Sequence, residues 1–178
     1  IDYVNPYIGN ISHLLVPTFP TVHLPNSMMR VCPERSDYTT DMIKGLPIVV
    51  TSHRGSSAFN ISVEQGEDAS LVPVRSYSYD LEKTVPYRYS VYLDEAKIGV
   101  DYAPSHQSGL YSFLLEKQEN SFIVLNVGNG ALKTEAGGIS GYQLIDGGLT
   151  KIYLYLETEQ NPKFTGTLAD GVVSYSIK

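Results

Sequence analysis

The sequence is poor in the residues that cross-link small domains or build thiolate metal centres. It holds no tryptophan and one cysteine among 178 residues. A single cysteine can form neither an intramolecular disulfide nor a thiolate metal cluster. We therefore interpret Cys32, which lies between Val31 and Pro33, as a small core residue.

Positive charge and long apolar runs are also scarce. Thirteen lysines and arginines stand against nineteen aspartates and glutamates, which gives a formal net charge of −6. Nucleic-acid-binding proteins cluster Lys and Arg to neutralise phosphates, so we expect no nucleic-acid partner. No apolar run approaches the roughly 18 residues that span a bilayer, so we expect no membrane span. No signal peptide is visible at Ile1, which is compatible with a processed chain.

Helical periodicity is nearly absent from the sequence. No segment of about ten or more residues combines apolar positions at helical spacing with capping residues at its ends. The least unfavourable helix candidate, Asp37–Lys44, is short. The fold must therefore be built mainly from strands.

Alternation at period two is abundant and predicts strands. Apolar side chains recur at every second residue over 87–93, 98–102, 111–115 and 152–156. Such alternation places one set of side chains on a buried face. Residues 121–127 are apolar at both parities, which indicates a central strand covered on both sides. The 14 tyrosines suit such strands, since the ring packs on the sheet while the hydroxyl reaches water.

Turn residues separate these expected strands. Asp94–Ala96 predicts one hairpin turn, and Asp170-Gly171 predicts another of type I′. Glycine clusters that tolerate positive φ predict further turns at 128–130, 137–138 and 146–148. Short strands at this spacing indicate an all-β fold, an antiparallel β-sandwich.

We expect one domain over residues 1–178, with no internal linker. Residues 1–45 differ from the rest, because they hold five prolines and few clean alternations. We interpret them as a loop-rich lead-in packed on the sheets.

No motif places a complete catalytic or metal site. The four histidines, His13, His23, His53 and His106, lie too far apart in sequence to form a local ligand pair, and we expect them on the surface or in loops. No nucleophile elbow occurs, so we predict no catalytic residue and no metal ligand in this chain.

Two acidic clusters and two sequons complete the search for chemistry. Glu64, Glu67 and Asp68 surround Gly66, and Asp80 and Glu82 flank Leu81; we interpret both clusters as solvated turns. The sequons begin at Asn10 and Asn60, and two matches are close to chance. For any single tyrosine a role as an ordinary sheet residue is favoured over sugar contact.

Several runs resemble glycoside hydrolase family 92, whose members are mostly bacterial exo-acting α-mannosidases. The opening Asp-Tyr-Val-Asn-Pro-Tyr-Ile-Gly run is similar to the family's Tyr-Val-Asn-Pro-Phe-Ile-Gly opening, and a Thr-Phe-Pro segment follows in both. The similarity is scattered over the chain in the right order. The matching segments are 2–9, 18–20, 28–34, 86–94, 98–105, 109–113, 139–142 and 152–155.

The resemblance implies a galactose-mutarotase-like supersandwich that packs against a helical (α/α)6 barrel in cis. It also implies that the catalytic acid, the base and the calcium ligands belong to that barrel, so calcium is expected there and no cofactor in this chain. The implied source is a bacterium, and the implied location is secreted, periplasmic or in the cell envelope.

The sequence departs from the family at two loops. Gly9–His13 replaces the family's Gly-Thr-Gly-Gly stretch, and Gly45–Gly55 lacks the histidine pair of the loop that faces the active site. The chain also has no tryptophan. These departures put a working mannose subsite in doubt.

Our leading hypothesis is the non-catalytic N-terminal sandwich of a family 92-like glycosidase. The candidates for meeting the barrel or a glycan are His13, Phe19, His53 and Arg54. The alternative is a stand-alone carbohydrate-binding or structural module of the bacterial envelope. A third possibility, an independent hydrolase, requires two carboxylates in one cleft, about 6.5–9.5 Å apart for an inverting reaction.

Overall fold

The structure is a computed structural model that describes residues 3–9, 18–36, 40–52, 57–66, 74–117, 120–159, 163–164 and 172–177. Its contacts divide the chain into two compact units, which are described separately. Unit 1 comprises Ile1–Ser57 and Ser76–Gln118, and unit 2 comprises Ala58–Arg75 and Glu119–Lys178. The chain therefore passes between the units three times, and neither unit is one continuous segment.

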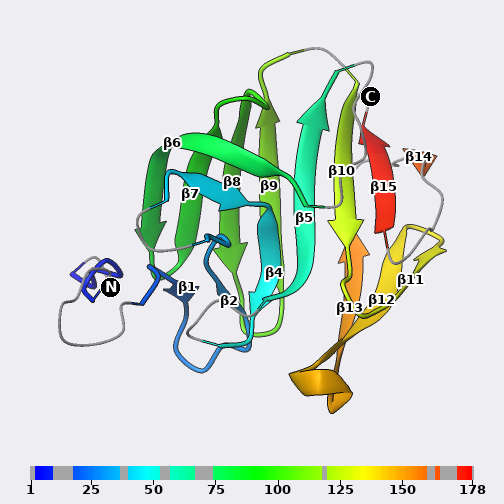
Figure 1. Cartoon of the computed structure of the whole chain (residues 1–178), viewed down its shortest axis with the longest axis horizontal. Helices are drawn as coiled ribbons and strands as arrows, with labels where there is room; N and C mark the ends of the chain where they lie inside the picture. Colours follow the sequence, from blue (N-terminus) through cyan, green and yellow to red (C-terminus); the bar gives the residue numbers. More distant parts are fainter. Residues whose placement is uncertain are drawn as a thin grey trace. The chain divides into compact units, whose positions relative to one another are not determined.

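Unit 1 is built around an antiparallel sheet in the order β3-β6-β7-β8-β9 (Figure 1). Its strands are β3 (Met42–Lys44), β6 (Ser76–Val85), β7 (Arg88–Leu93), β8 (Ile98–Pro104) and β9 (Gly109–Leu115). The unit also contains a short antiparallel pair and a further strand: β1 (Val22–His23), β2 (Arg30–Val31) and β4 (Leu46–Val50).

Unit 2 contains two sets of antiparallel strands. One has the order β14-β15-β10-β5, and the other has the order β11-β12-β13. The strands are β5 (Ser57–Gln65), β10 (Ser121–Asn126), β11 (Gly130–Glu135), β12 (Gly138–Ile145), β13 (Thr150–Glu157), β14 (Lys163–Phe164) and β15 (Val172–Ile177). A single 3-10 turn, η1 (Asp146–Gly148), joins β12 to β13.

The described residues confirm the predicted all-β class. Val91, Leu93, Ile98 and Val100 are buried on the inner face of β7 and β8, as their alternation predicts. Strand β10 lies between β15 and β5 and is buried at both parities, as expected for 121–127. The predicted turn at 94–96 joins β7 to β8, which pair from Leu93 opposite Ile98.

One local prediction is wrong: Tyr87 is 44% exposed and precedes β7, since the chain turns there before the alternation begins. Within the least unfavourable helix candidate, Met42–Lys44 is strand β3, because it pairs with β6. Asn60 is buried inside β5, so its sequon cannot accept a glycan in the folded chain, which agrees with a chance match. The predicted Asp170-Gly171 turn and the Asn10 sequon lie outside the described residues.

Two members of the acidic clusters, Glu64 and Glu82, are not solvated turn residues, whereas Asp80 is exposed as predicted and Glu67 and Asp68 lie outside the described residues. Glu64 lies on β5 with 3% of its side chain exposed, where Arg75 Nε donates to its Oε1 at 2.8 Å. Glu82 lies on β6 and pairs with Arg35, with 17% of its side chain exposed. Each buried carboxylate is retained because an arginine from elsewhere in the chain compensates its lost hydration.

Candidate functional site

Described residues of unit 1 line a pocket of about 260 Å³. Residues at the ends of short strands contribute to it. Phe19 lies shortly before β1, Lys44 is the last residue of β3, and Val50 is the last residue of β4. The segment that follows β2 supplies the remaining lining, Cys32, Pro33, Glu34 and Arg35.

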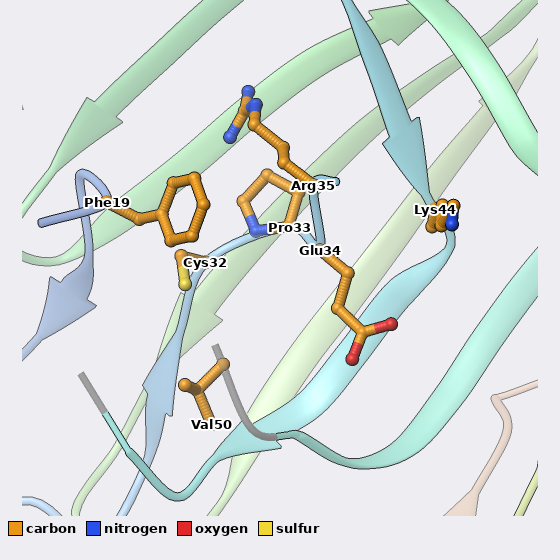
Figure 2. A pocket seen from close by; sticks show the side chains of 7 residues that line it. All are labelled: Phe19, Cys32, Pro33, Glu34, Arg35, Lys44 and Val50. Carbon is orange, nitrogen blue, oxygen red and sulfur yellow. The ribbon is translucent and has the colours of Figure 1, made fainter. Parts of the chain in front are cut away.

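The lining has an apolar side and a charged side. Figure 2 shows the Phe19 ring beside Cys32 and Pro33, whereas the Arg35 and Glu34 side chains point in opposite directions. Lys44 donates its backbone N–H to the Glu34 carbonyl at 2.8 Å, which links the segment after β2 to β3. Glu34 Oε1 accepts a hydrogen bond from the Ser57 hydroxyl.

Arg35 is fixed by a buried network on β6 and β7. Its Nη2 donates to Glu82 Oε1, its guanidinium carbon lies 5.1 Å from the centroid of the Tyr79 ring, and Tyr89 Oη donates to Glu82 at 3.0 Å. Burial by itself lowers the pKa of Arg35, but the Glu82 carboxylate outweighs it, so the pKa lies above its ordinary value. The arginine therefore stays charged and serves to hold the lining in place.

Cys32 behaves as the sequence predicts. It is buried with 4% exposure. Burial raises the pKa of its thiol, and the positive charges of Arg30 and Arg35 offset this only in part. The thiol is therefore a packing group and a poor nucleophile at neutral pH.

Among the described residues that line the pocket there is one carboxylate, Glu34, whereas glycoside hydrolysis uses a pair. No group of three or more His, Cys, Asp or Glu side chains gathers in the described part of the chain in a way that could hold a metal ion.

Of the four sequence candidates, Phe19 lines this pocket. His13, His53 and Arg54 lie outside the described residues, so their placement stays a prediction. His23 and His106 are exposed, as expected for surface histidines. Sequence reasoning did not find the pairing of Arg35 with Glu82, because the two residues lie 47 positions apart and no local motif links them.

An exposed aliphatic surface occurs on β9. Leu110 and Leu114 are 62% and 73% exposed, and they alternate with half-buried Tyr111 and Phe113. β9 is the last strand in the order of this sheet. Exposed apolar side chains that lie close together are typical of a surface that another protein segment covers.

A comparison with protein-family models identifies one family. The sequence model of the glycosyl hydrolase family 92 N-terminal domain matches residues 3–176. No curated protein matches the sequence. In the described part of the chain, no helix has the length and apolarity needed to cross a membrane.

Solved structures of family GH92 mannosidases are similar over nearly the whole chain. The inverting mannosidase BT2199 from Bacteroides thetaiotaomicron VPI-5482 matches with a TM-score of 0.75 and 18% identity, over 99% of this chain and 29% of its own. The α-mannosidase BT3965 from Bacteroides thetaiotaomicron matches with a TM-score of 0.72 and 17% identity, over 99% of this chain and 31% of its own. These likenesses show the fold, an antiparallel β-sandwich, and this chain spans about a third of each relative's length.

Proposed function

The chain belongs to the glycosyl hydrolase family 92 N-terminal domain family, and from this premise we propose that it supports the catalytic domain of a longer mannosidase-like enzyme. The observation that carries the proposal is the family match over 3–176, combined with coverage of only 29% and 31% of two solved mannosidases. In this proposal a helical barrel in cis supplies the catalytic acid and base, and this domain packs against it.

The β9 surface is our candidate for the contact with that barrel. Inter-domain interfaces bury roughly 600–1,500 Å², and exposed apolar side chains that lie together mark interaction surfaces. Leu110 and Leu114 offer such side chains on the last strand of the unit 1 sheet. The occupant is the remaining part of the enzyme, for which the relatives' greater length provides the argument.

We place calcium in the barrel rather than in this chain. Calcium takes six to eight oxygen ligands, mostly carboxylates and carbonyls. This placement is supported by the described residues, among which no three or more His, Cys, Asp or Glu side chains gather in a way that could hold a metal ion. A bacterial source and a secreted, periplasmic or envelope location belong to the same proposal, and the Bacteroides relatives support the first.

The first measurement is the intact mass of the native gene product, compared with 19.6 kDa for this chain. We expect a mass several times larger, and α-mannosidase activity that a chelator removes and calcium restores. The 178-residue chain alone should be inactive. A native product near 19.6 kDa would contradict the proposal and favour the stand-alone module.

The docking surface is tested in the full-length enzyme with Leu110→Asp/Leu114→Asp. We expect the two domains to separate more readily, so that limited proteolysis releases the sandwich about tenfold faster, because two charges lie in an apolar interface. Leu149→Asp is the matched control, since Leu149 is 91% exposed and lies in unit 2. Equal proteolysis rates for both variants and the parent enzyme would reject this surface.

A further inference from the structure

One face of the β11-β12-β13 sheet carries three tyrosines, and the strand register defines it. Tyr142 on β12 lies opposite Tyr153 on β13, and Ser140 lies opposite Tyr155. Directly opposed residues of antiparallel strands share a face, so these four side chains project from the same side. The other face carries Leu132 and Ile139, which are buried. The tyrosines therefore occupy the solvent side of this sheet, which is coloured yellow to orange in Figure 1.

Two of these rings are open to solvent. Tyr153 and Tyr155 are 74% and 53% exposed. This exposure agrees with the alternation over 152–156, which places the two tyrosines on the face opposite Ile152 and Leu154. Positions two apart on a strand lie about 7 Å from each other, so the two rings can contact one extended ligand side by side.

Neighbouring residues leave room for the tyrosine rings and hold them in position. A Cβ added at Gly138 would lie 2.4 Å from the Leu156 backbone oxygen and 3.3 Å from both Cζ and Oη of Tyr155, so the glycine allows the close approach of β13 and also leaves room for the ring. Tyr142 and Tyr153 have ring centroids 6.4 Å apart. Lys151 Nζ lies 4.3 Å from the Tyr142 centroid and 5.8 Å from the Tyr153 centroid, so it holds the pair by cation–π contact.

The charges on this face cancel. By register it carries two lysines, Lys133 and Lys151, and two glutamates, Glu135 and Glu157. Lys133 Nζ lies 2.7 Å from Glu135 Oε1, and the Ser140 hydroxyl donates to the same carboxylate at 2.6 Å. A balanced face attracts neither anionic nor cationic ligands over distance, but it supplies hydrogen-bond donors and acceptors beside the rings.

From this arrangement we propose that the tyrosine face of β12 and β13 binds a neutral polysaccharide, with Tyr153 and Tyr155 stacking against successive sugar units. Aromatic rings beside paired polar groups match the amphipathic faces of a sugar, whose C–H groups pack on the ring while its hydroxyls hydrogen-bond. A protein is a less suitable ligand for this face. A protein interface of standard size buries about 800 Å² on each partner around an apolar core, whereas Leu144 is the one aliphatic side chain larger than alanine on the described tyrosine face, and it is half-buried.

Affinity electrophoresis of the 178-residue chain tests the proposal, with native gels that contain soluble yeast α-mannan, galactomannan or hydroxyethyl cellulose. We expect at least one of these polysaccharides to retard the chain. Tyr153→Ala/Tyr155→Ala should weaken that binding about tenfold or more, because two stacking contacts are lost. Tyr153→Phe/Tyr155→Phe should stay within about threefold of the parent chain, since it keeps the rings and also controls for folding.

The matched control is Tyr3→Ala/Tyr87→Ala, which removes two exposed tyrosines from unit 1 and should leave the retardation unchanged. Binding should also be the same within about twofold at low and high salt, because salt screens charge but not stacking. The proposal is overturned by no retardation with any of the three polysaccharides, by equal binding of the alanine variant, or by loss of binding in high salt. Dimerisation of the chain that the alanine variant abolishes, without polysaccharide binding, would identify this face as a contact between copies and also overturn it.

Discussion

The ion pair between Arg35 and Glu82 is a clear case in unit 1 in which the stability of the fold depends on two individual side chains. The two side chains are 6% and 17% exposed, so both ions have lost most of their hydration. Mutual attraction and the Tyr89 hydroxyl, which donates to Glu82 at 3.0 Å, offset that loss. Removing one partner therefore leaves a buried charge without its counterion.

We expect Glu82→Ala to lower the free energy of unfolding by about 3 kcal/mol, because Arg35 remains charged and buried. The double substitution Arg35→Met/Glu82→Leu should recover most of the loss, since no charge is then buried. Urea denaturation of the three proteins measures both effects. A single substitution that costs less than about 0.5 kcal/mol would show that water already solvates this pair.

Tyr102 and Tyr111 form a natural comparison of two buried hydroxyls. Their ring centroids lie 4.7 Å apart. Tyr111 Oη donates to the Pro47 carbonyl at 2.6 Å, whereas Tyr102 Oη is buried without a partner. Tyr111→Phe should lower the free energy of unfolding by about 1 kcal/mol, and Tyr102→Phe should leave it unchanged or raise it, because no hydrogen bond is lost. Equal destabilisation of both variants in urea titrations would contradict this assignment.

At the scale of elements, β6 contains a bulge that decides where its side chains point. Asp80 pairs with Tyr92 and Lys83 pairs with Ser90, so Leu81 and Glu82 together oppose Val91. Leu81 has φ of 56° and is 82% exposed. The bulge thus turns the leucine outward and lets Glu82 reach Arg35.

We expect Leu81→Gly to leave the free energy of unfolding unchanged or to raise it by about 0.5 kcal/mol. The substitution relieves a left-handed backbone that costs leucine about 1 kcal/mol, and it sacrifices little burial. Val91→Gly is the control in the same bulge, and it should cost about 3 kcal/mol because Val91 is 4% exposed. Thermal unfolding measures both, and a large loss with Leu81→Gly would mean that the side chain packs where it is described as exposed.

At the scale of the whole molecule, buried tyrosines link stability to alkaline pH. Burial raises the pKa of Tyr102 to about 12, and it raises the pKa values of Tyr89 and Tyr111 as well. In the unfolded chain these groups have pKa values near 10. Between about pH 10 and pH 12 the unfolded state therefore binds fewer protons than the native state, so stability falls as pH rises.

We expect the free energy of unfolding to decline above pH 10 by about 1.4 kcal/mol per pH unit for each of these tyrosines. Below pH 10 the same groups are protonated in both states and contribute no slope. Urea titrations from pH 9 to pH 11 measure the decline, and Tyr102→Phe should remove about one tyrosine's share of it. A flat profile up to pH 11 would show that the three hydroxyls ionise equally well in the folded chain.

The sequence by itself determined the all-β class, the positions of β7, β8, β9, β10 and β13, and the family. These features follow from local rules, because the pleat of a strand imposes alternation every two residues and glycine clusters mark the turns. The Tyr-Val-Asn-Pro opening and the scattered matches indicated family 92, which the family model confirms.

Only the tertiary structure decided which charges are buried. Glu64 and Glu82 looked like turn residues, but arginines 11 and 47 residues away make their burial tolerable. The exposure of Tyr153 and Tyr155, by contrast, follows from the alternation over 152–156, which places Ile152 and Leu154 on one face of the strand and the two rings on the other. Burial of a charge depends on the residues that cover and compensate it, and those residues are distant in sequence, so no local pattern could determine it.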